Sequence, residues 1–258
     1  MSEEVHPRAS ELDAMSALDL VSLMHEEDAR AVRALEPQLE NIARAVDAIA
    51  EKLRAGGRMH YFGAGTSGLI AAMDAFECPP TFGVDVVRAH VVTEPGQEDD
   101  RNLGEKMARE AGLRSGDVAV GISASGRTAF VLGALAQATE DGATRIAITC
   151  RPESQLGRLA EVAIEVDTGP EVIAGSTRLK AGTVQKLVLN MLSTGVFTRL
   201  GRTHRGRMVG VVPGNAKLRE RAAGIIADLA GVSIEEARRR LKESGGDVAA
   251  ALAVERRA

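Results

Sequence analysis

Five short runs rich in β-branched and other apolar residues alternate with helical segments, and this alternation restricts the fold more than any other feature. The runs cover residues 58–63, 84–92, 117–123, 144–150 and 162–167. Buried strands separated by helices are typical of a parallel sheet with helices on both faces. We therefore expect an α/β fold with a doubly wound, mainly parallel five-stranded sheet.

Helical patterns flank this region on both sides. From Ser10 to about Ala55, apolar residues recur at three- and four-residue spacing, which predicts two or three helices broken near Pro37. We expect three parts: an N-terminal helical segment, a main sheet domain and a C-terminal three-helix appendage, at residues 1–48, 49–212 and 213–258.

The appendage contains its own helix signals. Ser233 followed by Glu236 predicts a capping box for its middle helix. The run "RRR" at 238–240 could form a basic binding patch, but glutamates interleave with it, which favours a solvated helix face.

Composition excludes several classes of function. The chain has 258 residues, a net charge of −4, one tyrosine and no tryptophan. It therefore has almost no aromatic surface for stacking bases, and we expect no nucleic-acid partner.

The two cysteines, Cys78 and Cys150, lack metal-ligand spacing, and we expect neither a disulfide framework nor a metal site. The polar N-terminus has no signal-peptide pattern and no apolar run approaches ~18 residues, so we expect no membrane association and a cytoplasmic location.

Glycine and hydroxyl residues follow the first and third predicted strands. These loops, "GAGTSG" (63–68) and "SASGRT" (123–128), precede helices and should lie at the carboxyl edge of the sheet, where ligands bind. Backbone amides at helix N-termini, assisted by hydroxyls, suit a phosphate. Two alternatives are tight turns without a ligand and a dinucleotide site, because "GAGTSG" matches G-x-G-x-x-G and Glu94 could bind a ribose.

A third polar group stands before an apolar helix, within residues 169–195. Its members are Glu171, Ser176, Thr177, Arg178 and Lys180. A structural interpretation is an N-cap followed by solvated cations. Cations in the first turn of a helix are unfavourable, however, because that end of the helix carries partial positive charge. We therefore expect an anion near Arg178 and Lys180, either a bound phosphate or a partner carboxylate.

The stretch "DAFECPPTFG" (74–83) places Glu77 where we expect a buried helix to end. An anion is mildly destabilised at a helix C-terminus. This placement suggests that Glu77 serves a function other than stability, and a carboxyl in apolar surroundings there would have a raised pKa.

These motifs together resemble the N-acetylmuramic acid 6-phosphate etherase family, whose members have a sugar isomerase (SIS) domain. The resemblance rests on "GAGTSG", "DAFECPPTFG", "EDD" at 98–100, "GISASGRT" and the long motif at 169–195, and it extends over nearly the whole chain. It implies the SIS fold with a UBA-like C-terminal appendage, a homodimer, and catalysis without a metal or organic cofactor.

The resemblance also implies a reaction and a set of site residues. The family is a group of lyases of peptidoglycan recycling and amino sugar catabolism that release D-lactate from N-acetylmuramic acid 6-phosphate. Glu77 matches the catalytic acid-base glutamate and Glu98 the glutamate associated with water addition. The residues expected to bind the phosphate and the sugar are Thr66, Ser67, Ser123, Ser125, Arg127, Thr128, Glu171, Ser176 and Lys180.

Three positions depart from the family pattern. Leu69 stands where Arg is common, His6 stands where Asn is common, and the stretch at 84–97 is shorter than usual. The shortened stretch keeps open a second hypothesis, a non-catalytic phosphosugar-binding regulatory protein. His60 and Glu171 are both candidates for the group that opens the sugar ring.

Overall fold

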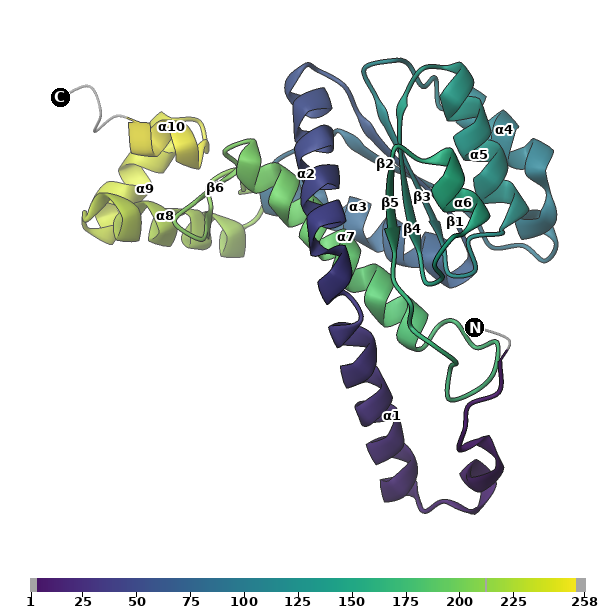
Figure 1. Cartoon of the computed structure of the whole chain (residues 1–258). Coiled ribbons are helices and arrows are strands. Elements are labelled where there is room, and N and C mark those ends of the chain that lie inside the picture. Colours follow the sequence, from purple (N-terminus) through teal and green to yellow (C-terminus); the bar gives the residue numbers. More distant parts are fainter. Residues whose placement is uncertain (1–3, 212, 254–258) are drawn as a thin grey trace. The chain divides into compact units, whose positions relative to one another are not determined.

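A computed structural model describes residues 4–211 and 213–253 (Figure 1). It divides into two compact units. The first comprises the described residues up to Asp74 together with Val86–Ser193, and the second comprises Ala75–Asp85 and the described residues from Thr194 onward. The domain boundaries expected from the sequence, at 48/49 and 212/213, stay a prediction.

A five-stranded sheet forms the centre of the first unit. All its neighbouring strands are parallel, in the order β2-β1-β3-β4-β5, which confirms the doubly wound sheet expected from the sequence. The strands are β1 (Met59–Ala64), β2 (Val87–Val92), β3 (Val118–Ser123), β4 (Thr144–Thr149) and β5 (Val162–Glu165).

Neighbouring residues of β1 show that helices cover both faces of the sheet. Tyr61 bonds to Asp74 of α3 (Gly65–Phe82), whereas Phe62 belongs to an apolar cluster with Phe130 of α5 (Ala129–Glu140). Successive strand side chains point to opposite faces, so α3 and α5 lie on opposite sides of the sheet. Figure 1 shows α4 (Arg101–Glu110) and α6 (Gln155–Leu159) on the same side as α5. The point between β1 and β3 is therefore the topological switch point of the sheet.

Helices precede the sheet, as the sequence predicts. The turn η1 (Ala9–Ala14) is followed by α1 (Ala17–Arg33), η2 (Glu36–Gln38) and α2 (Leu39–Arg54). The Ser16 hydroxyl accepts a hydrogen bond from the Asp19 N–H and so caps α1. Pro37 lies in η2, which confirms the expected break.

The connection from β5 leads through a loop to α7 (Lys180–Arg199), whose residues up to Ser193 belong to the first unit. Ser193 of α7 donates a hydrogen bond of 2.9 Å to Asp74, so α7 and α3 pack together in this unit.

The second unit contains the hairpin β6–β7 and three short helices. The elements are β6 (Thr203–His204), β7 (Arg207–Met208), α8 (Ala216–Ala230), α9 (Ile234–Glu243) and α10 (Val248–Ala253). The Ser233 hydroxyl caps α9 by accepting from the Glu236 N–H, as predicted. The three arginines at 238–240 pair with glutamates, which confirms a salt-bridged helix face rather than a free basic patch. Among the residues that the structure describes, none of the helices is long and apolar enough to cross a membrane.

Candidate functional site

The loop after β1 is a tight turn that leads directly into α3. A Cβ on Gly63 would lie 2.8 Å from the Cα of Gly68, and a Cβ on Gly68 would lie 2.6 Å from the carbonyl oxygen of Gly63. Because such contacts are too short for a side chain, both positions require glycine. The turn places the half-buried Thr66 and Ser67 in the first turn of α3, at the carboxyl edge of the sheet.

The loop after β3 gathers three hydroxyl groups. The Ser123 hydroxyl lies 2.7 Å from that of Thr128 and 3.5 Å from that of Ser125, and it accepts a hydrogen bond from the Gly126 N–H. Gly126 has a φ of +64°, and a Cβ there would lie 2.4 Å from the Cβ of Ser154. The exposed Arg127 donates its N–H to the Ser125 hydroxyl.

The N-terminus of α5 follows this loop without a side-chain cap. Thr128 is the N-cap residue, yet its side chain makes no capping hydrogen bond. The first backbone N–H groups of a helix favour an anion when no side chain satisfies them. The loop after β3 therefore combines hydroxyl donors with a helix N-terminus, the arrangement predicted for a phosphate.

The start of α7 brings a third group of residues to the same edge of the sheet. A Cβ on Gly182 would lie 3.5 Å from the methyl group of Thr66, so α7 begins beside the first loop. A small hollow lies between the loops that follow β3, β4 and β5. Its lining includes Ser125, Cys150, Thr168, Glu171, Thr177 and Ala181. The hollow thus joins the second loop to the third polar group of the sequence.

Glu171 is buried and caps α7. Its two carboxylate oxygens accept hydrogen bonds of 3.0 Å from the N–H groups of Lys180 and Ala181. An anion at this position satisfies two free N–H groups and favours the positive end of the helix dipole. Ser176 is half-buried, and its N–H donates to the carbonyl of Ile173 within the same loop.

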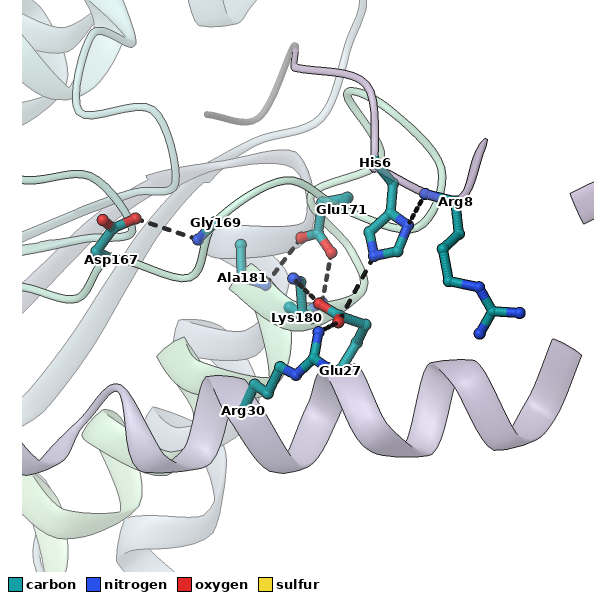
Figure 2. A network of polar contacts seen from close by, with 9 residues as sticks. All are labelled: His6, Arg8, Glu27, Arg30, Asp167, Gly169, Glu171, Lys180 and Ala181. Atoms are coloured by element: carbon teal, nitrogen blue, oxygen red, sulfur yellow. Dashed lines mark hydrogen bonds and ion pairs between the residues drawn. The ribbon is translucent and has the colours of Figure 1, made fainter. Parts of the chain in front are cut away.

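Lys180 is also buried, and its ammonium group donates a hydrogen bond of 2.6 Å to Glu27 of α1 (Figure 2). Burial by itself raises the pKa of Glu27, but the hydrogen bond and charge of Lys180, together with Arg30 and His6, lower the pKa below its ordinary value. The anions beside the start of α7 are therefore two carboxylates of the chain, Glu171 and Glu27. Glu27 is a partner carboxylate for Lys180, one of the two alternatives expected from the sequence.

Sequence reasoning missed Glu27, although a signal was present. Leu23, Glu27 and Ala31 recur every four residues and are the buried residues of α1. A glutamate on the apolar face of an amphipathic helix is unusual and requires a buried partner. His6 was noted only as a departure from a pattern, and its Nε2 lies 3.5 Å from the Glu27 carboxylate.

Glu77 lies inside α3 and not at its end, so the expected helix terminus was wrong. The helix continues through Pro79 and Pro80 to Phe82, and Gly83, with a φ of +66°, then terminates it by donating its N–H to the Pro79 carbonyl. Glu77 is exposed, so among the described residues it does not have the apolar surroundings that we expected for it.

Glu98 lies in the turn η3 (Gln97–Asp99) before α4, and its side chain is exposed. The helix α4 itself begins at Arg101, so Glu98 precedes it. Asp100 is the N-cap and accepts a hydrogen bond of 3.0 Å from the Leu103 N–H. Asp100, and not Glu98, therefore caps α4.

His60 lies at the amino end of β1, away from the loops at the carboxyl edge. Its Nδ1 is 3.0 Å from the Nε2 of His90, and the two rings stack. Burial, and then the charge of His90, lower the pKa of His60 to about 4. The structure therefore does not bring His60 to the candidate site.

Comparison with known proteins identifies the family. The SIS domain family matches residues 25–150. N-acetylmuramic acid 6-phosphate etherase 2 of Bacillus licheniformis is 44% identical over 97% of this chain and 88% of the relative. The N-acetylmuramic acid 6-phosphate etherase of Symbiobacterium thermophilum is 46% identical over 94% of this chain and 84% of the relative. The chain belongs to the N-acetylmuramic acid 6-phosphate etherase family.

Solved structures of low sequence identity share the fold of this etherase-family chain. Phosphoheptose isomerases from Neisseria gonorrhoeae and Francisella tularensis superpose with TM-scores of 0.56 and 0.57 at 22% and 18% identity, and each match covers 71% of this chain and 100% of the other. This similarity confirms the predicted SIS fold.

Proposed function

We propose that this etherase-family protein is a lyase that cleaves the D-lactyl ether of N-acetylmuramic acid 6-phosphate. The products are N-acetylglucosamine 6-phosphate and D-lactate, and the reaction serves the recycling of cell-wall amino sugars in the cytoplasm. The observation that carries the proposal is the identity of 44% to a named etherase over 97% of the chain. The two hydroxyl-bearing loops at the switch point of the sheet support it.

The chemistry proceeds by elimination and then addition. In the ring-opened sugar, the proton on carbon 2 is acidic because it lies beside the aldehyde. Its removal forms a double bond between carbons 2 and 3 and breaks the bond from carbon 3 to the lactyl oxygen, which leaves as lactate after receiving a proton. Water then adds its oxygen to carbon 3 and a proton to carbon 2. Both steps need positioned acid-base groups.

Glu77 is the proposed acid-base group of the elimination, taking the proton from carbon 2 and donating one to the lactyl oxygen. Glu98 is the proposed base for the incoming water. Both side chains are exposed, which leaves them accessible to a ligand. The cofactor-free chemistry implied by the family needs only these proton transfers.

The substrate-binding residues are proposed by the same reasoning. Thr66, Ser67, Ser123, Ser125, Arg127 and Thr128 bind the phosphate and the sugar hydroxyls, while Glu171, Ser176 and Lys180 complete the pocket. The hydroxyl cluster beside the uncapped start of α5 supports a phosphate there. The ammonium of Lys180 is bonded to Glu27, which supports an indirect contribution of this side chain.

A homodimer is part of the proposal. The family resemblance implies it, with sites near the subunit interface. Leu69 and Met73 of α3 are exposed apolar side chains suited to such an interface.

Lactate release from N-acetylmuramic acid 6-phosphate by the purified protein is the direct test. We expect stoichiometric lactate and N-acetylglucosamine 6-phosphate. Binding of the sugar phosphate without any lactate release would contradict the enzyme and support the regulatory protein that the shortened 84–97 stretch had suggested. Sedimentation in solution tests the dimer separately, and a monomer would contradict this part of the proposal.

A further inference from the structure

A buried network of charges connects the N-terminal helix α1 to the start of α7, and Glu27 is its centre (Figure 2). The Glu27 side chain is 6% exposed. It accepts a hydrogen bond of 2.6 Å from the Lys180 ammonium and pairs with the Arg30 guanidinium on its own helix. His6 reaches it from the N-terminal segment, with its Nε2 3.5 Å from a carboxylate oxygen.

His6 faces Glu27 through its Nε2. The Arg8 N–H donates a hydrogen bond of 3.1 Å to His6 Nδ1, so Nδ1 is the acceptor nitrogen and the ring proton is on Nε2, toward Glu27. Glu27 therefore has donors on both sides, from the N-terminal segment and from α7. Its carboxylate has a fixed place in the first unit.

Lys180 connects Glu27 to the candidate site. It is the first residue of α7, and its N–H and that of Ala181 donate to Glu171. The first turn of α7 is thus fixed twice, by Glu171 through the backbone and by Glu27 through the Lys180 side chain. Ala181 and Glu171 both line the hollow beside Ser125.

Attachment of α1 to the rest of the unit does not by itself require an ion pair. Replacement of a buried pair by apolar side chains of similar size is often neutral or stabilising. An apolar contact between α1 and α7 would therefore attach the helix equally well. What the charged pair adds is a short, directional contact that specifies one position of Lys180.

We propose that Glu27 is a positioning residue of the sugar-phosphate site. Through Lys180 it sets the place of the first turn of α7, and with it the wall of the hollow formed by Ala181, Thr177 and Glu171. The inference rests on the proposed function, because the ligand bound by the loops beside this hollow is taken to be a sugar phosphate. Glu27 does not touch the ligand in this arrangement and acts only through Lys180.

Glu27→Gln is the first test, with Glu26→Gln as the matched control on the exposed side of the same helix. For Glu27→Gln we expect KM for N-acetylmuramic acid 6-phosphate to rise about tenfold or more while kcat stays within about threefold, the pattern of lost ligand binding rather than lost chemistry. Glu26→Gln should leave both constants unchanged. An unchanged KM in Glu27→Gln overturns the inference.

A double replacement separates positioning from stability. Glu27→Met combined with Lys180→Met converts the buried ion pair into an apolar pair, which we expect to restore the melting temperature lost in either single variant. Exchange of the Ala181 N–H, which donates to Glu171, should stay about tenfold faster than in the unchanged protein, because an apolar pair does not fix the start of α7. Recovery of slow exchange together with the melting temperature would show a merely structural role and overturn the inference.

Hydrogen exchange measured without ligand tests the role of Glu27 independently of the proposed function. We expect the N–H groups of Lys180 and Ala181, which donate to Glu171, to exchange about tenfold faster or more in Glu27→Gln than in the unchanged protein. Equal exchange overturns the inference whatever the enzyme does. Absence of lactate release from the unchanged protein overturns the proposed function instead, and the exchange rates then decide the role of Glu27.

Discussion

The hydroxyl of Tyr61 donates a hydrogen bond of 2.9 Å to the carboxylate of Asp74, and this contact joins β1 to α3 inside the first unit. Ser193 of α7 donates to the other oxygen of the same carboxylate at 2.9 Å. Burial raises the pKa of Asp74, while the hydrogen bonds from Tyr61 and Ser193 act in the opposite direction. One buried carboxylate thus connects a central strand to two helices.

Replacement of Tyr61 by phenylalanine should destabilise the protein by about 1.5–3 kcal/mol at pH 7, the usual range for a hydrogen bond to a charged group. The pKa of Asp74 is raised in the fold, so its contribution to stability is present at acid pH and is lost as pH rises through that folded pKa. Because the Tyr61 hydrogen bond limits this loss, the effect of Tyr61→Phe should be smaller near pH 4. Urea unfolding at the two pH values measures it, and an equal effect at both would contradict the assignment.

Replacement of Glu77 by glutamine should abolish lactate release and leave the affinity for the sugar phosphate within about tenfold, because an amide keeps the shape but transfers no proton. Exchange of the carbon 2 proton with deuterated water should stop as well. Lactate assays and mass spectrometry measure the two effects. Ordinary turnover by Glu77→Gln would leave this exposed side chain without a catalytic role.

Replacement of Glu98 by glutamine should slow water addition more than elimination. The unsaturated aldehyde should then accumulate after lactate has left, visible as transient ultraviolet absorbance of a conjugated carbonyl. Asp100→Ala provides the control, since it removes the cap of α4 and should lower stability without producing this intermediate. If neither half-reaction changes in Glu98→Gln, the shortened 84–97 stretch has placed this glutamate outside the site.

Replacement of Ser125 by alanine should weaken binding of phosphorylated sugars by about 1.5–3 kcal/mol, because it removes a hydrogen bond to a charged group. Residual binding of the unphosphorylated sugars should scarcely change. Calorimetric titration of both ligand types measures the difference, and Ser67→Ala is expected to behave in the same way. Equal losses for both ligand types would show that these loops do not hold the phosphate.

Replacement of His60 by phenylalanine should reduce the acid sensitivity of the fold. The pKa of His60 is lowered from 6.5 to about 4, so its neutral form stabilises the protein above pH 6.5 and this contribution is lost as pH falls toward 4. The loss approaches about 1.4 kcal/mol per pH unit for one proton. Unfolding at pH 7 and pH 4.5 should show a smaller decline for the variant, and an identical decline would contradict the assignment to His60.

Local pattern was sufficient to predict the sheet and the loops at its carboxyl edge. The five apolar runs became the five parallel strands, and the glycine and hydroxyl residues of 63–68 and 123–128 lie where parallel topology places them. These predictions depend on residues close together in the sequence, for which alternation and turn chemistry are reliable guides.

Contacts between distant residues could not be predicted in the same way. Glu27 and Lys180 are 153 positions apart, and their contact depends on how α1 and α7 pack. The end of α3 was misplaced for a different reason. Two prolines normally end a helix, but α3 continues through Pro79 and Pro80, and its buried residues favour a longer helix than local propensity indicates.

The close packing of Gly63 against Gly68 limits how this fold can be re-engineered. Each glycine occupies the space that a side chain on the other would need, so neither position tolerates even alanine while the backbone stays in place. A library designed to change the preferred sugar should therefore keep both glycines fixed. Its diversity belongs at the exposed Leu69, which follows Gly68 on the same helix and has room to vary.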